Sequence, residues 1–146
     1  MLAALSSPRL DTPRRAETLR ADCQAFLDAT LASKSYLRVA SLCTADGRAF
    51  AFSCAQDDAD SHRVAAIASS LLALSESFSR EVLRSACKYS LISTDHGVIV
   101  TVRVPNARRT HALSIATDSS EMLALVLRHA LDAAASLATI LDQSSH

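Results

Sequence analysis

The side chains best suited to chemistry in this chain are five histidines, and they are widely separated. None takes part in an H-E-x-x-H arrangement, the spacing that places two zinc ligands on one face of a helix. The sequence therefore predicts no metal site and nominates no general base. The five are His62, His96, His111, His129 and His146.

The four cysteines also lack the spacing of a reactive or metal-binding group. They form no C-x-x-C pair, and their neighbours are largely apolar, as in the run ASLCTA around Cys43. We expect them to be reduced and to act as small core residues, as free cysteines in intracellular proteins commonly do, with disulfides as the alternative. They are Cys23, Cys43, Cys54 and Cys87.

Glycine content excludes the common nucleotide-binding loops. Gly47 and Gly97 are the only glycines, so neither G-x-G-x-x-G nor G-x-x-x-x-G-K-[ST] can form, and no G-x-S-x-G elbow presents a serine nucleophile. We predict no catalytic residue, no cofactor and no enzymatic activity. An enzyme that uses Cys54 or His111 in an unfamiliar constellation stays open as an alternative.

Overall composition favours a single globular domain without a strong electrostatic preference. The 146 residues are 49% hydrophobic, and 15 basic residues balance 15 acidic ones, so no net charge draws the molecule toward nucleic acid. We expect no membrane span, since no apolar run approaches the roughly 20 residues that a span needs. Met1 to Leu5 is too short for a secretory signal, and the expected compartment is the cytoplasm.

Basic residues nevertheless gather in two places along the chain. One group surrounds the turn between the last two predicted strands, and the other follows the second predicted helix. Both are candidates for receiving an acidic partner surface, while ordinary solvated loop charges are the alternative, because isolated surface charges contribute little. The candidate partner surface comprises Arg80, Arg84, Lys88, Arg103, Arg108 and Arg109.

The elements that must position these groups follow from hydrophobic spacing and turn residues. Thr12-Pro13 is a helix-start signal, the turn Asp46-Gly47 suits a tight hairpin, and Asp118 or Ser119 can cap a long last helix. We predict one domain over 12–142, after a disordered leader at 1–11 and before a frayed tail at 143–146. The predicted elements are a helix to about Lys34, strands 37–44 and 48–54, a helix beginning near Ser61, strands 87–94, 98–104 and 110–117, and a last helix to about Leu141.

The second helix has an ambiguous apolar face. Val64, Ile67, Leu71, Leu74 and Phe78 follow helical spacing, which predicts an amphipathic helix. This face either covers the sheet or mediates self-association. The small residues of AAIASSLLALS would let another backbone approach closely, and the pattern alone does not separate the two roles.

Order and spacing of these segments resemble the roadblock/dynein light chain family over Ala21 to Leu141. The likeness rests on VASLCTADGRAFAFS, RVAAIASSLLALSESFSREV, KYSLISTDHGVIVTVRV and THALSIATDSSEMLALVLRHALDAAASLATIL. One departure is SFSREVLRSACKYS, which lacks the glycine often found before the third strand in relatives. The other is the arginine-bearing last turn.

The resemblance implies a fold and a mode of assembly. The fold is an α/β (α+β), profilin-like three-layer sandwich of order α-β-β-α-β-β-β-α, with the second helix on one face of a five-stranded antiparallel sheet and the other two helices on the opposite face. Family members typically form homodimers through helix two and the third strand, which hides a strand edge. The residues assigned to this interface are Val64, Ile67, Ala68, Leu71, Leu72, Ser75, Tyr89 and Leu91.

The resemblance also implies a function. Relatives commonly bind Ras-like small GTPases, so we expect a noncatalytic homodimeric regulatory or scaffold protein of the GTPase-activator or adaptor type. A small-ligand sensory module, or a light-chain-like subunit of a larger complex without a GTPase, is the alternative. Neither the partner nor its nucleotide state follows from the sequence.

Overall fold

Three helices and five strands make up the chain. The computed structural model describes residues 7–55, 59–118 and 123–143, with backbone alone for 7–12. The element order predicted from the sequence is confirmed. The elements are α1 (Ser7–Ser33), β1 (Leu37–Thr44), β2 (Ala49–Cys54), α2 (Ser61–Leu83), β3 (Ser90–Thr94), β4 (Gly97–Arg103), β5 (His111–Thr117) and α3 (Leu123–Gln143).

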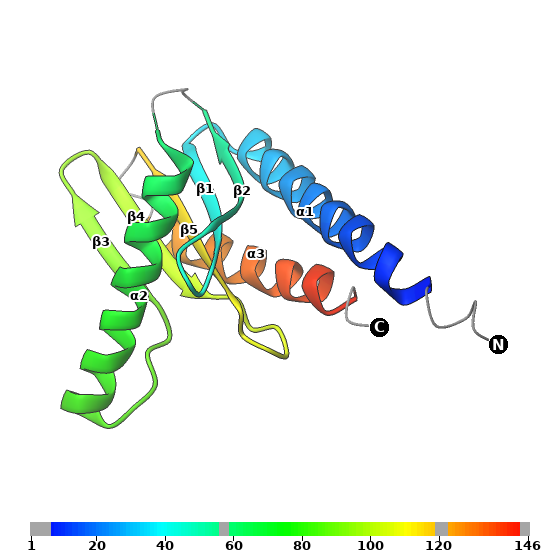
Figure 1. Ribbon diagram of the computed structural model, residues 1–146. Coiled ribbons are helices and arrows are strands. Elements are labelled where there is room, and N and C mark those ends of the chain that lie inside the picture. Colours follow the sequence, from blue (N-terminus) through cyan, green and yellow to red (C-terminus); the bar gives the residue numbers. More distant parts are fainter. Residues whose placement is uncertain (1–6, 56–58, 119–122, 144–146) are drawn as a thin grey trace.

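The strands form one antiparallel sheet in the order β2-β1-β5-β4-β3. Helix α2 crosses one face, and α1 and α3 lie on the other (Figure 1). The predicted three-layer sandwich is therefore confirmed. Strands β2 and β3 are left as the two edges of the sheet.

The main core lies between the sheet and the helix pair α1 and α3. Alternate residues of β4 point into this core, because successive side chains of a strand face opposite sides of the sheet. The apolar stripe of α3 packs against them. Its fully buried members include Leu27, Leu42, Val98, Val100, Leu113, Ile115, Val126 and Leu137.

The opposite face of the sheet is covered by small side chains. Here α2 buries Ala65, Ala68 and Leu72 against Cys43 and Ala112. Thr101 and Ser114 alternate with the main-core residues of β4 and β5, and their hydroxyl groups bond at 2.8 Å. These small side chains let α2 lie close to the sheet. Most of the larger apolar residues of α2 therefore point away from the sheet.

The β1–β2 hairpin carries a bulge. Gly47 has φ of 88° in the turn, a conformation that glycine adopts without steric cost, as the Asp46-Gly47 pair predicted. The register shifts between Leu42 and Cys43, which pair with Ala51 and Ala49. Phe50 is therefore the extra residue of β2, and its ring lies half-buried against the main core.

Some element boundaries differ from the sequence prediction. Helix α1 begins at Ser7, before the expected start at Thr12, and contains Pro13. Pro8 in the first turn suits a helix start as well as Pro13 does, so residues 7–11 are helical and do not belong to a disordered leader. Strand β3 begins at Ser90, three residues after the predicted Cys87. The rest of the expected leader, residues 144–146 of the expected tail, and Ser119 as a cap lie outside the described residues.

Helix α2 is capped at both ends. Asp60 accepts bonds from the backbone amides of His62 at 3.0 Å and Arg63 at 3.4 Å, which satisfies donors that have no partner within the helix. Arg84 ends the helix in a left-handed conformation with φ of 51°. The caps fix the length of α2 and hence the positions of the side chains along it.

Helix α3 is long and apolar enough to cross a membrane by length and composition, contrary to the expectation that no segment of the chain would qualify. The structure gives its apolar stripe another use. Residues such as Val126, Ala130 and Leu137 are buried against the sheet, as in the core helix of a globular domain.

Candidate functional site

An exposed apolar stripe runs along the outer face of α2. Because α2 turns Ala65, Ala68 and Leu72 toward the sheet, larger apolar residues on another side of the helix face outward. Ile67, Leu74 and Phe78 are 60%, 69% and 72% exposed. We call Ile67, Leu71, Leu74, Phe78 and Val82 the α2 stripe. Contiguous apolar surface of this kind commonly marks an interaction site.

The eight residues assigned to a dimer interface separate into three groups in the structure. Ala68 and Leu72 are buried against the sheet within the chain, so their side chains cannot reach a partner. This corrects their assignment, which followed the helical repeat without knowing which side the alanines would take. Leu91 packs partly against the main core. The remaining five reach the surface on α2 or beside β3: Val64, Ile67, Leu71, Ser75 and Tyr89.

The two edge strands of the sheet differ in whether their outward backbone groups have hydrogen-bond partners. On β2, the side chain of Gln24 in α1 accepts from the Phe52 amide at 2.9 Å and donates to the Phe52 carbonyl at 2.6 Å. Asp28 accepts from the same amide nitrogen of Gln24 at 3.0 Å and so fixes its orientation. Gln24 thus takes the place that a neighbouring strand would occupy.

Strand β3 has no such clamp in the part of the chain that the structure describes. Ser75 on α2 reaches only the Ser90 hydroxyl, and Thr94 bonds the Gly97 carbonyl. No side chain among the described residues bonds a backbone group of β3. The β3 edge is therefore free to pair with another strand.

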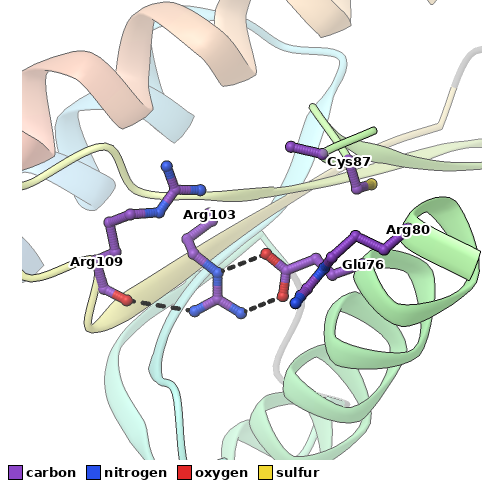
Figure 2. Close-up of a pocket in the computed structure, with 6 residues that line it drawn as sticks. Glu76, Arg80, Cys87, Arg103 and Arg109 are labelled. Atoms are coloured by element: carbon purple, nitrogen blue, oxygen red, sulfur yellow. Dashed lines mark hydrogen bonds and ion pairs between the residues drawn. The ribbon is translucent and has the colours of Figure 1, made fainter. Parts of the chain in front are cut away.

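A polar groove lies beside the C-terminal half of α2, away from the β1–β2 hairpin. It has a volume of about 490 Å³, opens to solvent, and is lined by Glu76, Arg80, Ala86, Cys87, Arg103 and Arg109 (Figure 2). The lining comes from α2, the segment that follows it, the end of β4 and the turn before β5. Three of the six predicted partner-surface residues therefore meet here, whereas Arg84, Lys88 and Arg108 do not line the groove.

Glu76 and Arg103 form a two-pronged ion pair at the centre of the groove. Nε of Arg103 donates to Oε2 of Glu76 at 2.8 Å and Nη2 donates to Oε1 at 2.7 Å. Their side chains are only 16% and 17% exposed. The bonds from Arg103 hold the pKa of the Glu76 carboxyl below its ordinary value, despite the opposing effect of burial, and the positive charges of Arg103, Arg109 and Arg80 act in the same direction.

Glu76 was not predicted as a site residue. It was one acidic residue in a helix, and its partner lies 27 positions away on another element. Only the sheet topology brings the end of β4 under the last turns of α2. The same holds for Gln24 and Phe52, which are 28 positions apart.

The residues considered for catalysis do not converge. Cys54 lies opposite Val39 and His111 opposite Thr44 on the same strand β1, which separates them by roughly 16 Å at the usual rise per residue. The described residues contain no group of three histidine, cysteine or acidic side chains arranged to hold a metal ion. Burial raises the pKa of the Cys23 thiol to about 11, which disfavours the reactive thiolate.

The class that the fold and the site define is a three-layer α/β domain with an unclamped strand edge and an exposed apolar stripe. The model of the Roadblock/LC7 domain matches residues 24–107, and the chain belongs to this family. No curated protein matches the sequence.

Known structures share the fold at low identity. MglB of Myxococcus xanthus superposes with a TM-score of 0.74 at 14% identity, covering 86% of this chain and 91% of its own. An MglB with a tetrameric arrangement gives 0.74 at 17%, covering 86% and 92%. A Roadblock/LC7 domain from Streptomyces avermitilis gives 0.70 at 15%, covering 81% and 96%. These likenesses extend over most of the described chain and support the fold.

Proposed function

We propose that this protein is a noncatalytic, homodimeric regulatory or scaffold protein of the cytoplasm that binds a Ras-like small GTPase. The observation that carries the proposal is the pairing of an exposed α2 stripe with the unclamped β3 edge. Membership of the Roadblock/LC7 family adds to it, since the family resemblance implies both dimers and GTPase partners.

The dimer is built from the two features that one chain leaves uncovered. Pairing of β3 with β3 of a second copy supplies partners for its free backbone groups, and the α2 stripes of the two copies cover each other. The partial exposure of Ser75 and Tyr89, beside β3, makes the apolar surface continuous with the strand edge. A stable interface of this kind buries about 1,000 Å² or more.

The GTPase binds the dimer through surface contacts and not through a catalytic residue. The described residues contain no group of three side chains arranged to hold a metal ion, and in this proposal the protein acts by preferring one conformation of its partner. A scaffold of this type shifts the partner's nucleotide state by differential binding to the two conformations.

Sedimentation and pull-down experiments test the two parts separately. We expect a dimer at micromolar concentration that the double variant Leu74→Glu, Phe78→Glu converts to a monomer, because the new charges cannot be buried without partners. The matched control is Ala73→Glu, which adds a charge to the other side of the same helix turn. A monomeric wild-type protein would contradict the dimer.

The GTPase partner is tested with purified Ras-like small GTPases of the same organism, loaded with GDP or with a nonhydrolysable GTP analogue. We expect binding to the wild-type protein in one state more than in the other. A change in GTP turnover distinguishes an activator from a passive scaffold. Absence of binding in both states would exclude the GTPase and favour a light-chain-like subunit.

A further inference from the structure

We infer that the groove between α2 and the β4–β5 turn is a docking site for an acidic peptide segment of the partner protein, with Arg80 and Arg109 as the cations that receive its carboxylates. The inference deepens the proposed function, because it names the chemistry of the partner segment.

Charge is the first reason for this assignment. The groove contains three arginines and one glutamate, and Glu76 neutralises only Arg103, through the two-pronged pair. Among the described residues, neither Arg80 nor Arg109 forms an ion pair. Two positive charges therefore remain for a ligand, and arginine binds carboxylates with strong, directional bonds.

The second reason is that the groove is held in shape by its own contacts. Nη1 of Arg103 donates to the carbonyl of Arg109 at 3.4 Å, which ties the turn to the ion pair. The backbone of Arg109 is left-handed, with φ of 51°, a strained conformation that surrounding contacts must maintain. In Figure 2, Arg103 lies between Arg80 and Arg109, and no dashed line joins the guanidinium of Arg109 to Glu76. Its donors are thus available to an incoming group.

Dimerisation through the α2 stripe leaves this groove open. Arg80 and Glu76 each lie two positions from Phe78, and residues two apart on a helix point to nearly opposite sides, about 160° apart. The stripe and the groove therefore occupy opposite flanks of α2. One copy can use its stripe for the second copy and its groove for the partner.

A carboxylate segment fits the groove better than a phosphate group does. The Glu76 carboxylate forms part of the lining, and it repels a doubly charged phosphate more than a single carboxylate. The groove is also open along its length, and Ala86 gives it an apolar wall against which a peptide backbone can lie. We therefore assign a peptide occupant.

The test uses a hexaglutamate peptide and the full chain, followed by NMR of the arginine Nε signals. We expect the signals of Arg80 and Arg109 to shift on titration, and the double variant Arg80→Gln, Arg109→Gln to bind about tenfold more weakly. The control is Arg84→Gln, Arg108→Gln, which removes the same charge outside the groove. Glu76→Gln is expected to bind more tightly than the wild type, since it removes the one repelling charge.

Three outcomes would overturn the inference. They are equal weakening by the control pair, no strengthening by Glu76→Gln, and larger shifts with inorganic phosphate than with the peptide, which would make the groove a phosphate site. Because the peptide replaces the GTPase, the docking site and the proposed partner can fail independently. Circular dichroism of each variant confirms that the fold is retained.

Discussion

Strands β2 and β3 are the two edges of one sheet, and the chain treats their outward backbone groups differently. On β2, Gln24 bonds both backbone groups of Phe52, and the bulge at Phe50 interrupts the strand. On β3, backbone groups are unclamped among the described residues, and the α2 stripe runs beside them. A sheet with two open edges can grow without limit, whereas one with a single open edge stops at a pair. The contrast supports the proposed closed dimer, because blocking one edge of the sheet excludes open-ended strand addition.

The largest expected effect comes from the glycines of the two edge hairpins. A Cβ on Gly97 would collide with the Thr117 carbonyl oxygen, which is backbone and cannot move aside. Gly97→Ala should therefore cost about 3 kcal/mol or more of the free energy of unfolding and displace the β3–β4 hairpin. The matched variant Gly47→Ala meets no clash but has a left-handed backbone, so its cost should be about 1 kcal/mol. Urea unfolding measures both, and equal losses would contradict the difference.

The second prediction concerns the ion pair between Glu76 of α2 and Arg103 of β4, on the flank of α2 opposite the stripe. Arg103→Met leaves the poorly exposed Glu76 carboxylate without its partner and should cost about 2 kcal/mol. Glu76→Gln keeps one hydrogen-bond acceptor toward Arg103 and buries no unpaired negative charge, so it should cost less. Because the pKa of Glu76 is lowered in the folded state, its stabilisation is present above the ordinary glutamate pKa and is lost as the pH falls below about 4.3. In thermal melts, the difference in melting temperature between the wild type and Arg103→Met should become smaller as the pH falls over that range.

Several parts of this contrast were predictable from sequence, because they depend on residues that are close together along the chain. The hairpin at Asp46-Gly47, the start of α2 near Ser61 and the strand at 98–104 depend on neighbours a few residues away, and each was predicted. The orientation of α2 was not, because its sheet-facing side is made of Ala65 and Ala68, while Ile67 and Leu74 match a core helix equally well. Hydrophobic spacing finds the stripe but cannot tell which side of the helix the sheet takes.

The candidate site was predicted only in part, for the same reason. Arg80, Arg103 and Arg109 were recognised as local clusters of charge, and the fold brings them to one groove. Glu76 and Gln24 act on residues of other elements across 27 and 28 positions. No pattern within a window of ordinary helix or strand length contains such pairs.

The third prediction tests the clamp on β2 directly. Gln24→Ala removes two bonds to a strand edge that water can partly replace, so the loss of stability should be about 1 kcal/mol. The more specific results are faster hydrogen exchange at the Phe52 amide and assemblies larger than a dimer by light scattering. Asp28→Ala is the control, since it removes the residue that orients Gln24 but leaves both bonds to Phe52 possible. Unchanged exchange at Phe52 would show that Gln24 does not protect the edge.

The smallest effect is expected from pH, and it should fall on β2 and not on β3. The His111 ring packs edge-on against Phe50 with centroids 4.7 Å apart, and the Arg20 guanidinium lies 5.2 Å above the same Phe50 ring. Nδ1 of His111 bonds the Thr110 hydroxyl at 2.7 Å, while Nε2 is buried without a partner among the described residues. Burial lowers the pKa of His111, because the charged imidazolium is poorly solvated there.

A lowered histidine pKa means that the unfolded chain binds the proton more readily than the folded one. Stability is then full above the unfolded value of about 6.5 and declines as the pH falls below it. The variant His111→Gln does not titrate at this position, so its free energy of unfolding should decline less as the pH falls. The difference in stability between the variant and the wild type should therefore be smaller at pH 5. Hydrogen exchange should show which strand loses protection at low pH. Loosening around Phe50 should lower the protection of β2 amides, whereas the protection factors of β3 amides, corrected for the intrinsic exchange rate, should stay as they are at pH 7. A uniform response of both edges would mean that His111 acts on global stability alone, and that the bulge does not set β2 apart.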